Sequence, residues 1–507
     1  MSERQSGNPA GEIEALAAMF GRWLDGYRAG VSAMPVRSQV RPGEVVGKLP
    51  QAAPETGFRD GDAAAGWAEV LRDLDEIVVP GLTHWQHPRF FGYFPANASV
   101  PAMMGELVSA GLGVQGMLWL TSPACTEIET RVLDWLREML GLPECFDSRN
   151  GLGGGVIQGT ASEATLTAMV AARDRVRRWR KKVGIGERGE YVVYASGQAH
   201  SSVLKAAMIA GIADGPQDAV HVRMIDVDGA FAMRRESLAA AMREDLAAGR
   251  VPCFVCSSVG TTGTTAVDPT DKIAATIGEV CGAEGDGVPV WLHVDAAHAG
   301  SACVAPEFRW MLRGVERADS FCFNPHKWLL TNFDCDCFYL RDRRPLIDAM
   351  SVTPEYLRNT PSDSGEVIDY RDWQVPLGRR FRALKLWFVI RAYGVSGLRE
   401  HVRRTVGLAA LFESLVRADG RFEIVAPRVV NLVCFRLKGS DGANQSLMER
   451  LNATGRVFLS HTMLASPPAA SDARYTIRVA VGTPTTSEAD IRELWARVLE
   501  TALEPAL

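Results

Sequence analysis

The sequence has no long hydrophobic run and no large excess of charge of either sign. Its 507 residues carry a formal net charge of −5, so a nucleic-acid-binding protein driven by overall charge is not expected. The most apolar stretch, around residues 107–120, is interrupted by glycines and is too short to cross a bilayer. The first residues lack the basic and apolar regions of a secretory signal. We therefore expect a cytoplasmic protein with neither nucleic acid nor membrane as a partner.

Cysteine is also sparse, with ten residues in the whole chain, which excludes a disulfide-rich scaffold. Cys253 and Cys256 have CxxC spacing, and Cys335 lies close to Cys337. Neither pair is accompanied by a second Cys or His pair at the spacing of a zinc site. Both pairs lie in apolar, strand-like segments, so we expect buried free thiols and no metal.

Apolar residues make up 47% of the chain and charged residues 23%, which is typical of a globular protein with a large core. The length alone predicts about three domains. Between residues 150 and 340, strands alternate with helices such as 162–182 and 271–283. The expected strands cover residues 156–158, 191–195, 219–225, 253–257, 289–294, 320–323 and 337–340. This alternation predicts an α/β fold with parallel strands, in which ligands bind outside the carboxyl ends of the strands.

The regions on either side of this α/β segment have a different character. Residues 11–27 and 63–78 show helical periodicity and are joined by a polar connector. The polar stretch after residue 350 predicts a long, functional loop. A helix at 382–393 follows, and the tail has the pattern of a small α+β domain with strands near 429–437 and 475–481.

Four segments carry residues suited to chemistry, and the first reads GGGVIQGTASEATL. A strand turns at Gly159 into a helix, where Thr160 and Glu163 have the spacing of a capping box. The backbone amides of Ala161 and Ser162 would then form an anion site suited to phosphate. The alternative is an ordinary capped helix. The glycines precede the strand, so the segment matches a dinucleotide-binding motif poorly.

The second segment, PVWLHVDAAHAG, ends a buried strand at Asp295. Asp295 and Ala297 face the same side of such a strand. A buried carboxylate needs a cationic partner or strong hydrogen bonds, and a protonated pyridine nitrogen is one such partner. The alternative is an aspartate that only caps a turn.

The remaining two segments supply an amine and a flat ring. Lys327 lies in the apolar run SFCFNPHKWLL, where loss of hydration would lower its pKa and make it a nucleophile able to form a Schiff base. A lysine that extends to the surface is the alternative. His200 in YVVYASGQAHSSV follows a strand and could stack on a flat cofactor, or be a core histidine. A phosphate site, a buried carboxylate, an amine and a stacking ring together indicate pyridoxal 5′-phosphate.

The chain resembles the group II pyridoxal-phosphate decarboxylases, and most of all the aromatic L-amino acid decarboxylases that act on dopa, tyrosine and tryptophan. The resemblance rests on HPRFFGYFPANAS, SPACTEIET, GVIQGTASEATL, AHSSV, GTTGTT, HVDAA, NPHKWLL and DYRDWQVPLGRRFRALKLW. It implies fold type I, like aspartate aminotransferase, with a large, mixed, mostly parallel sheet. It also implies a homodimer with active sites at the interface. The expected parts are a helical dimerisation segment (1–99), a cofactor domain (100–384) containing a mobile catalytic loop (351–366), and a small domain (385–507).

The resemblance also implies roles for individual residues. Lys327 is expected to form the Schiff base, Asp295 to bind the ring nitrogen and His200 to stack on the ring. The other expected cofactor contacts are Ala161, Ser162, Thr262, Ala297, Asn324 and His326. The expected substrate pocket contains Trp85, Tyr93, Phe94, Pro95, Met117 and Gly378.

Tyr356 corresponds to the tyrosine of the family's mobile loop, which is the candidate proton donor. Relatives with Phe there tend to form aldehydes, so Tyr356 and His200 favour simple decarboxylation to an arylalkylamine and CO2. The expected substrate is tryptophan, dopa, tyrosine or phenylalanine. The chain departs from animal members at Ala96, where they have Thr, and at Met117, where they have Phe. Gly378 leaves room that favours tolerance of indole.

Three alternatives stay open at this point. One is an aromatic aldehyde synthase on the same scaffold. Another is a decarboxylase of a non-aromatic acid such as glutamate or 2,4-diaminobutyrate, against which the aromatic and apolar residues of 85–95 argue. The third is a scaffold that binds the cofactor without catalysis, against which Lys327, Asp295, His200 and Tyr356 argue.

Overall fold

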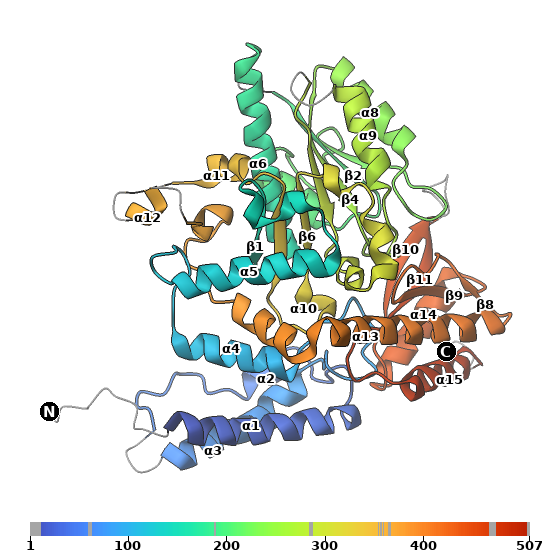
Figure 1. Ribbon diagram of the computed structural model, residues 1–507. Coiled ribbons are helices and arrows are strands. Elements are labelled where there is room, and N and C mark those ends of the chain that lie inside the picture. The colour runs from blue at the N-terminus through green and yellow to red at the C-terminus, as the bar shows by residue number, and fades with distance from the viewer. Residues whose placement is uncertain are drawn as a thin grey trace.

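A seven-stranded sheet forms the centre of the computed structural model, which describes residues 12–58, 63–186, 189–282, 287–352, 354, 357, 359–363, 367–465 and 473–503 (Figure 1). The strand order is β1-β7-β6-β5-β4-β2-β3. The strands are β1 (Gly154–Gln158), β2 (Tyr191–Ser196), β3 (Val222–Ile225), β4 (Val251–Ser258), β5 (Trp291–Asp295), β6 (Ser320–Phe323) and β7 (Asp336–Leu340). Strands β3, β2, β4, β5 and β6 are parallel, whereas β7 is antiparallel to both of its neighbours. The predicted α/β fold with a mixed, mostly parallel sheet is confirmed.

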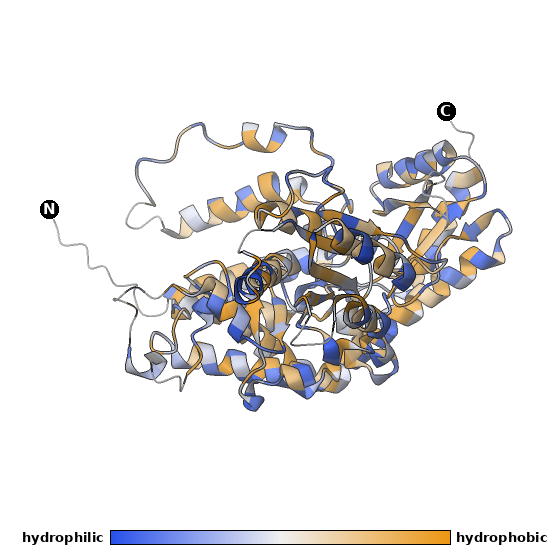
Figure 2. Ribbon diagram, turned by 90° about the horizontal axis from the view of Figure 1, so that it is seen from above, coloured by the Kyte–Doolittle hydropathy of each residue, from blue (hydrophilic) through white to orange (hydrophobic). Residues whose placement is uncertain are grey.

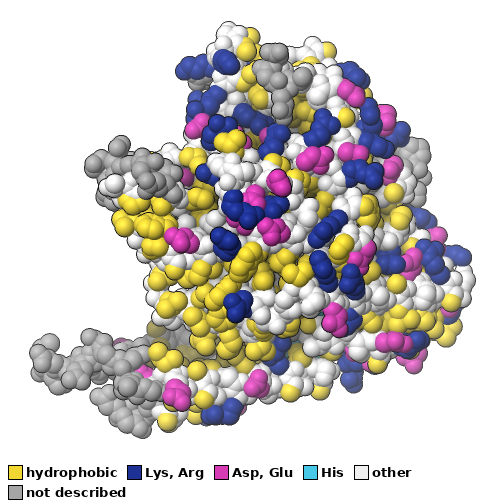
Figure 3. Space-filling model, in the orientation of Figure 1, with side chains coloured by type: hydrophobic (Ala, Val, Ile, Leu, Met, Phe, Trp, Pro, Cys, Tyr) yellow, Lys and Arg dark blue, Asp and Glu magenta, His cyan; other side chains and the backbone are white. Residues whose placement is uncertain are grey.

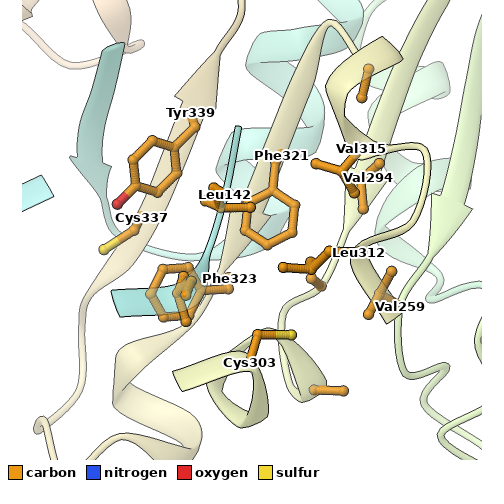
Figure 4. Close-up of a cluster of buried hydrophobic side chains, with 14 of the residues drawn as sticks. Leu142, Val259, Val294, Cys303, Leu312, Val315, Phe321, Phe323, Cys337 and Tyr339 are labelled. Atoms are coloured by element: carbon orange, nitrogen blue, oxygen red, sulfur yellow. The ribbon is translucent and has the colours of Figure 1, made fainter. Parts of the chain in front are cut away.

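Helices cover both faces of this sheet because successive strand residues point to opposite sides. Val156 packs in one buried cluster with Ala168 of α6, whereas its neighbour Ile157 belongs to the other cluster with Leu136 of α5. Figure 4 shows part of the second cluster, including Phe321. The helices of this region are α5 (Pro123–Leu140), α6 (Ala161–Lys182), α7 (Ser202–Ile209), α8 (Arg235–Ala247), α9 (Thr270–Cys281), α10 (Pro325–Trp328), α11 (Arg344–Met350) and α12 (Thr360–Asp363). Strands buried on both faces explain the nearly continuous apolar runs in the sequence.

A second, antiparallel sheet lies at the C-terminal end, in the order β10-β11-β9-β8. Its elements are β8 (Phe422–Ile424), β9 (Leu432–Leu437), α14 (Asp441–Ala453), β10 (Ser460–Ala465), β11 (Ala473–Ala480) and α15 (Glu488–Leu503). Helix α13 (Ala383–Ala418) joins the two sheets and bends at Gly394, whose φ of 60° suits glycine. The helix predicted at 382–393 is therefore only its first third. The predicted domain limits at 99 and 384 stay a prediction.

The N-terminal helices lie at the base of the molecule in Figure 1 and have little core of their own. They are α1 (Glu12–Gly30), α2 (Glu44–Gly47), α3 (Ala63–Asp73) and α4 (Val100–Leu112). No residue of α1 is buried. It packs on α3 through the rings of Phe20 and Trp67, whose centroids are 5.8 Å apart.

Hydrophobic side chains gather on the surface over α4 and the start of α13 (Figure 3). On α4 they are Val100, Met104, Leu107, Val108 and Leu112, all of which are exposed. Elsewhere the helices alternate hydrophobic and hydrophilic residues, as Figure 2 shows. A contiguous exposed apolar patch of this kind marks an interaction surface.

Two other sequence expectations can be compared with the structure. The ten cysteines are free thiols, and all except the partly buried Cys145 are buried, as predicted. Among the described residues, no helix combines the length and the hydrophobicity that crossing a bilayer requires.

Candidate active site

A cavity of about 220 Å³ opens at the edge of the large sheet where β4 and β5 end. Its walls come from the segments that follow β1, β2, β4, β5 and β6, and from the segment around Phe94, before α4. The lining residues are Phe94, Thr160, Ala161, Ser162, His200, Ser202, Ser258, Gly260, Thr261, Thr262, Asp295, Ala297, His298, Asn324, His326, Lys327 and Phe333. Every residue that the sequence predicts as a cofactor contact therefore lies at this one cavity.

Lys327 belongs to the four-residue helix α10, which directly follows β6. Its neighbour Trp328 is fully buried. The Nζ atom of Lys327 lies 5.8 Å from the centroid of the Phe94 ring. Burial lowers the pKa of the Lys327 amine, and the nearby Asp295 carboxylate offsets part of that effect. An amine with a lowered pKa is more often unprotonated, which is the state that attacks an aldehyde carbon.

Asp295 is the last residue of β5 and only 8% exposed. One of its oxygens accepts a hydrogen bond from the backbone amide of Ala297 at 3.0 Å. It makes no ion pair within 4 Å among the residues that the structure describes. A carboxylate in this position is suited to a cationic group that enters the cavity.

His200 lies between β2 and α7, on the exposed side of the cavity. Its Nδ1 atom accepts a hydrogen bond from the backbone amide of Ser202 at 3.1 Å, so the ring carries its proton on Nε2. Burial lowers the pKa of His200, the Asp295 carboxylate raises it, and Lys327 lowers it. His200 therefore presents a neutral, flat ring at neutral pH.

The N-terminus of α6 differs from the predicted capping box. The Thr160 side chain makes no cap hydrogen bond. The Glu163 carboxylate instead accepts a hydrogen bond from the Gly159 amide at 3.0 Å, one residue earlier than a capping box requires. Thr160 and Ser162 line the cavity. The 22-residue helix α6 starts between them, and the unpaired backbone amides of such a helix start favour an anion.

Two buried histidines complete the wall of the cavity. His326 accepts a hydrogen bond from the Cys335 amide at Nδ1 (2.9 Å), and burial lowers its pKa to about 3. The His298 ring stacks between Phe94, at a centroid distance of 3.7 Å, and Trp328, at 5.0 Å. Burial also lowers the pKa of His298 to about 3, so both rings are neutral at physiological pH.

His298 links the cavity to the second sheet, a role that the sequence analysis missed. Its Nε2 atom donates to Oδ1 of Asn431, at 2.7 Å, just before β9. The signal was present, since His298 follows Asp295 in the segment HVDAAHAG. Thr160, Thr261 and Phe333 also line the cavity and were not predicted as site residues.

The residues present fit pyridoxal 5′-phosphate. The Asp295 carboxylate without an ion pair matches a protonated ring nitrogen. The start of α6, with the Ser162 hydroxyl, matches a phosphate. The Lys327 amine matches the aldehyde.

The predicted substrate residues are distributed differently. Phe94 lines the cavity, whereas Trp85, Tyr93, Pro95, Met117 and Gly378 are not among its lining residues. Trp85 and Tyr93 stack on each other at 5.8 Å and are 39% and 54% exposed. Tyr356 lies outside the described residues, as does much of the predicted loop 351–366.

Comparisons with known proteins identify the family. The pyridoxal-dependent decarboxylase conserved domain matches residues 44–438. The chain is 46% identical to phenylacetaldehyde synthase of Arabidopsis thaliana over 94% of this chain and 93% of that one. It is 44% identical to tyrosine decarboxylase 2 of Narcissus pseudonarcissus, covering 92% and 89%. The crystal structure of Oryza sativa TDC with PLP and tryptamine superposes with a TM-score of 0.91 at 40% identity, covering 99% and 100%.

Proposed function

We propose that this chain, which belongs to the pyridoxal-dependent decarboxylase family, converts an aromatic L-amino acid into the arylalkylamine and CO2. It is a carboxy-lyase with pyridoxal 5′-phosphate as its cofactor. The observation that carries the proposal is the gathering of Lys327, Asp295, His200 and the start of α6 around one cavity. Each of these groups suits one part of the cofactor.

The roles of the cavity residues follow from their chemistry. When bound, pyridoxal 5′-phosphate supplies an aldehyde and an electron-withdrawing ring that accepts the electrons left by CO2. Lys327 would hold the aldehyde, and Asp295 would keep the ring nitrogen protonated. Ala297 and His200 would contact the ring. The remaining cofactor contacts are Ala161, Ser162, Asn324, Thr262 and His326.

Tyr356 is proposed to deliver the proton that replaces the carboxylate on the substrate α-carbon. Closure of the loop that carries it excludes water at that moment. The carboxylate is expected to leave from an apolar part of the site, because losing CO2 removes its charge.

A second candidate function is an aromatic aldehyde synthase, in which decarboxylation is followed by oxidation with dioxygen, which is reduced to peroxide, and the amine leaves as ammonia. The similarity to phenylacetaldehyde synthase favours it as much as the similarity to tyrosine decarboxylase favours the amine. Tyr356 and His200 favour the amine.

We also propose that the enzyme is a homodimer with its active sites at the interface. The exposed apolar face of α4 and the absence of buried residues in α1 support a partner surface. The substrate pocket would then combine the cavity of one chain with exposed residues such as Trp85 and Tyr93 of the other. Met117 and Gly378 would shape the space for the substrate ring.

A product screen tests these proposals directly. Purified holoenzyme is incubated separately with tryptophan, dopa, tyrosine, phenylalanine, glutamate and 2,4-diaminobutyrate, and amine, aldehyde and peroxide are measured. We expect amine from at least one aromatic substrate, with no peroxide. Aldehyde with stoichiometric peroxide would establish the synthase instead. Turnover of only glutamate or 2,4-diaminobutyrate would contradict the aromatic assignment.

A further inference from the structure

Asp336 opens strand β7 and is a buried acid to which the proposed chemistry assigns no role. Its side chain is fully buried, and neither carboxylate oxygen has a hydrogen-bond partner among the described residues. It makes no ion pair there either. An ionised carboxylate without partners is very costly inside a protein, so this position requires either a cation or a proton on the acid.

The register of the sheet shows what lies opposite. Asp336 pairs with Gln158 of β1 in the antiparallel ladder, so both side chains leave the sheet on the same face. Gln158 is also fully buried. Its Nε2 atom donates to the Trp373 carbonyl at 2.9 Å and to the Thr167 hydroxyl oxygen at 3.5 Å, which fixes the orientation of the amide, and its Oε1 atom has no partner.

Two facing, buried side chains therefore offer only acceptor atoms to each other. A proton on the Asp336 carboxyl supplies the missing donor and satisfies Gln158 Oε1 as well. Leaving these atoms unpaired would cost the full desolvation of each buried group.

The charges around Asp336 favour the same state. Burial raises its pKa well above the ordinary value, and the acidic groups of Cys335, Asp295 and Glu163 raise it further, against a smaller opposing effect of Lys327. Two carboxyl groups in one buried region do not both ionise readily. A neutral Asp336 leaves Asp295 as the carboxylate that faces the cavity.

We propose that Asp336 is a positioning residue that carries a proton and donates a hydrogen bond to Gln158 Oε1, thereby fixing the end of β1 where the phosphate-binding turn begins. Gln158 is followed directly by Gly159 and Thr160, and α6 starts at Ala161. The positioning part rests on the proposed phosphate contacts of the cavity, whereas the protonation part does not depend on them.

Infrared difference spectroscopy of the holoenzyme at neutral pH tests the proton. The wild type minus Asp336→Asn difference spectrum should contain a protonated carboxyl band, because the variant lacks that group. Asp245→Asn is the matched control, because Asp245 is equally buried but is ion-paired with Arg223 and Arg250 at 3.2 and 2.8 Å, so it should lose ionised carboxylate bands. Loss of carboxylate bands from Asp336→Asn would overturn the proposal.

A second variant identifies the hydrogen-bond partner and does not require substitution of Asp336. Gln158→Leu removes the acceptor, so the protonated carboxyl band of Asp336 should move to higher frequency as its hydrogen bond is lost. A band that stays in place in a folded Gln158→Leu enzyme would contradict the assigned partner.

Cofactor titration of apoenzyme tests the positioning. Asp336→Asn keeps a donor and should bind pyridoxal 5′-phosphate within about twofold of wild type. Asp336→Leu leaves Gln158 Oε1 unpaired and should bind it about tenfold more weakly. Equal binding by both variants would overturn the positioning role. If wild type and Asp336→Asn bind the cofactor equally and neither forms amine, the proposed function fails and this inference stands.

Discussion

The cofactor cavity and the aromatic group of Trp85 and Tyr93 are both predicted parts of one active site, yet a single chain arranges them very differently. The cavity brings together residues from six segments of the chain. Trp85 and Tyr93 stack on each other at the surface and are not among the lining residues.

The difference separates two tasks. The groups that hold the cofactor follow adjacent strands of one sheet, so folding of one chain places them. Exposing apolar aromatic surface to water is unfavourable, and the partner chain of the proposed homodimer would remove that surface from water. In the proposed homodimer, one chain would supply the chemistry and the contact between two chains would supply a large share of substrate selection.

Replacing Lys327 would break the cavity side of the comparison most completely. Lys327→Ala should reduce kcat to less than about one thousandth of wild type, because loss of a covalent catalyst costs at least that much in other enzymes. The absorbance of the lysine-bound cofactor should vanish as well. Steady-state product assays and absorbance spectra measure both effects, and an active, coloured variant would contradict the role of Lys327.

The loop tyrosine tests whether the product is decided outside the cavity. Tyr356→Phe should divert product from amine to aldehyde, ammonia and peroxide, because the substrate α-carbon loses its proton donor and is oxidised instead by dissolved dioxygen, with water supplying the aldehyde oxygen. Chromatography with a peroxide assay measures the ratio. Amine alone, formed at the wild-type rate, would show that the proton comes from elsewhere.

Hybrid dimers sharpen the comparison itself. One chain carries Lys327→Ala, and the other keeps Lys327 but carries Trp85→Ala and Tyr93→Ala, for which we expect a KM about tenfold above wild type from the lost ring contacts. If the aromatic group serves the partner's cavity, the purified hybrid should regain the wild-type KM at one of its two sites. A hybrid that keeps the raised KM would place the aromatic group in the site of its own chain.

The smallest effect concerns the stability of the cavity wall. The folded-state pKa of His298 is about 3, below the ordinary value near 6.5, so the unfolded chain binds the extra proton and stability falls as the pH drops through that window. The titration of His298 should lower the free energy of unfolding by about 2 kcal/mol between pH 7 and pH 5. His298→Gln keeps a donor for Asn431 and cannot titrate, so urea denaturation should show a smaller loss by that amount. An unchanged loss would show that His298 titrates normally.

Much of the cavity was predictable because its residues end strands. The apolar run before Asp295 predicted a buried strand, and β5 ends at that residue. The apolar flanks of Lys327 predicted its burial; Lys327 is partly buried and Trp328 beside it is fully buried. Both signals are local, so one segment of sequence contains them.

The features that could not be predicted depend on which side chain binds a given backbone amide. The Glu163 carboxylate bonds to Gly159 where the spacing predicted a capping box, and no spacing rule reports that choice. The strand expected at 219–225 starts only at Val222, because the Asp218 side chain takes the backbone amides of Val220 and His221 into a turn. Tyr93 packs on Phe458, far along the chain, and no local pattern around residues 85–95 predicts that contact.

Lys327 lies on the connection between two strands that are neighbours in the sheet. Phe323 at the end of β6 pairs with Cys337 near the start of β7, so the excursion that carries the lysine leaves and re-enters the sheet at adjacent points. The pairing of β6 with β7 therefore holds both ends of the segment that carries Lys327. The position of the lysine depends on the central sheet, whereas other walls of the cavity belong to the outer helices or contact the second sheet through His298.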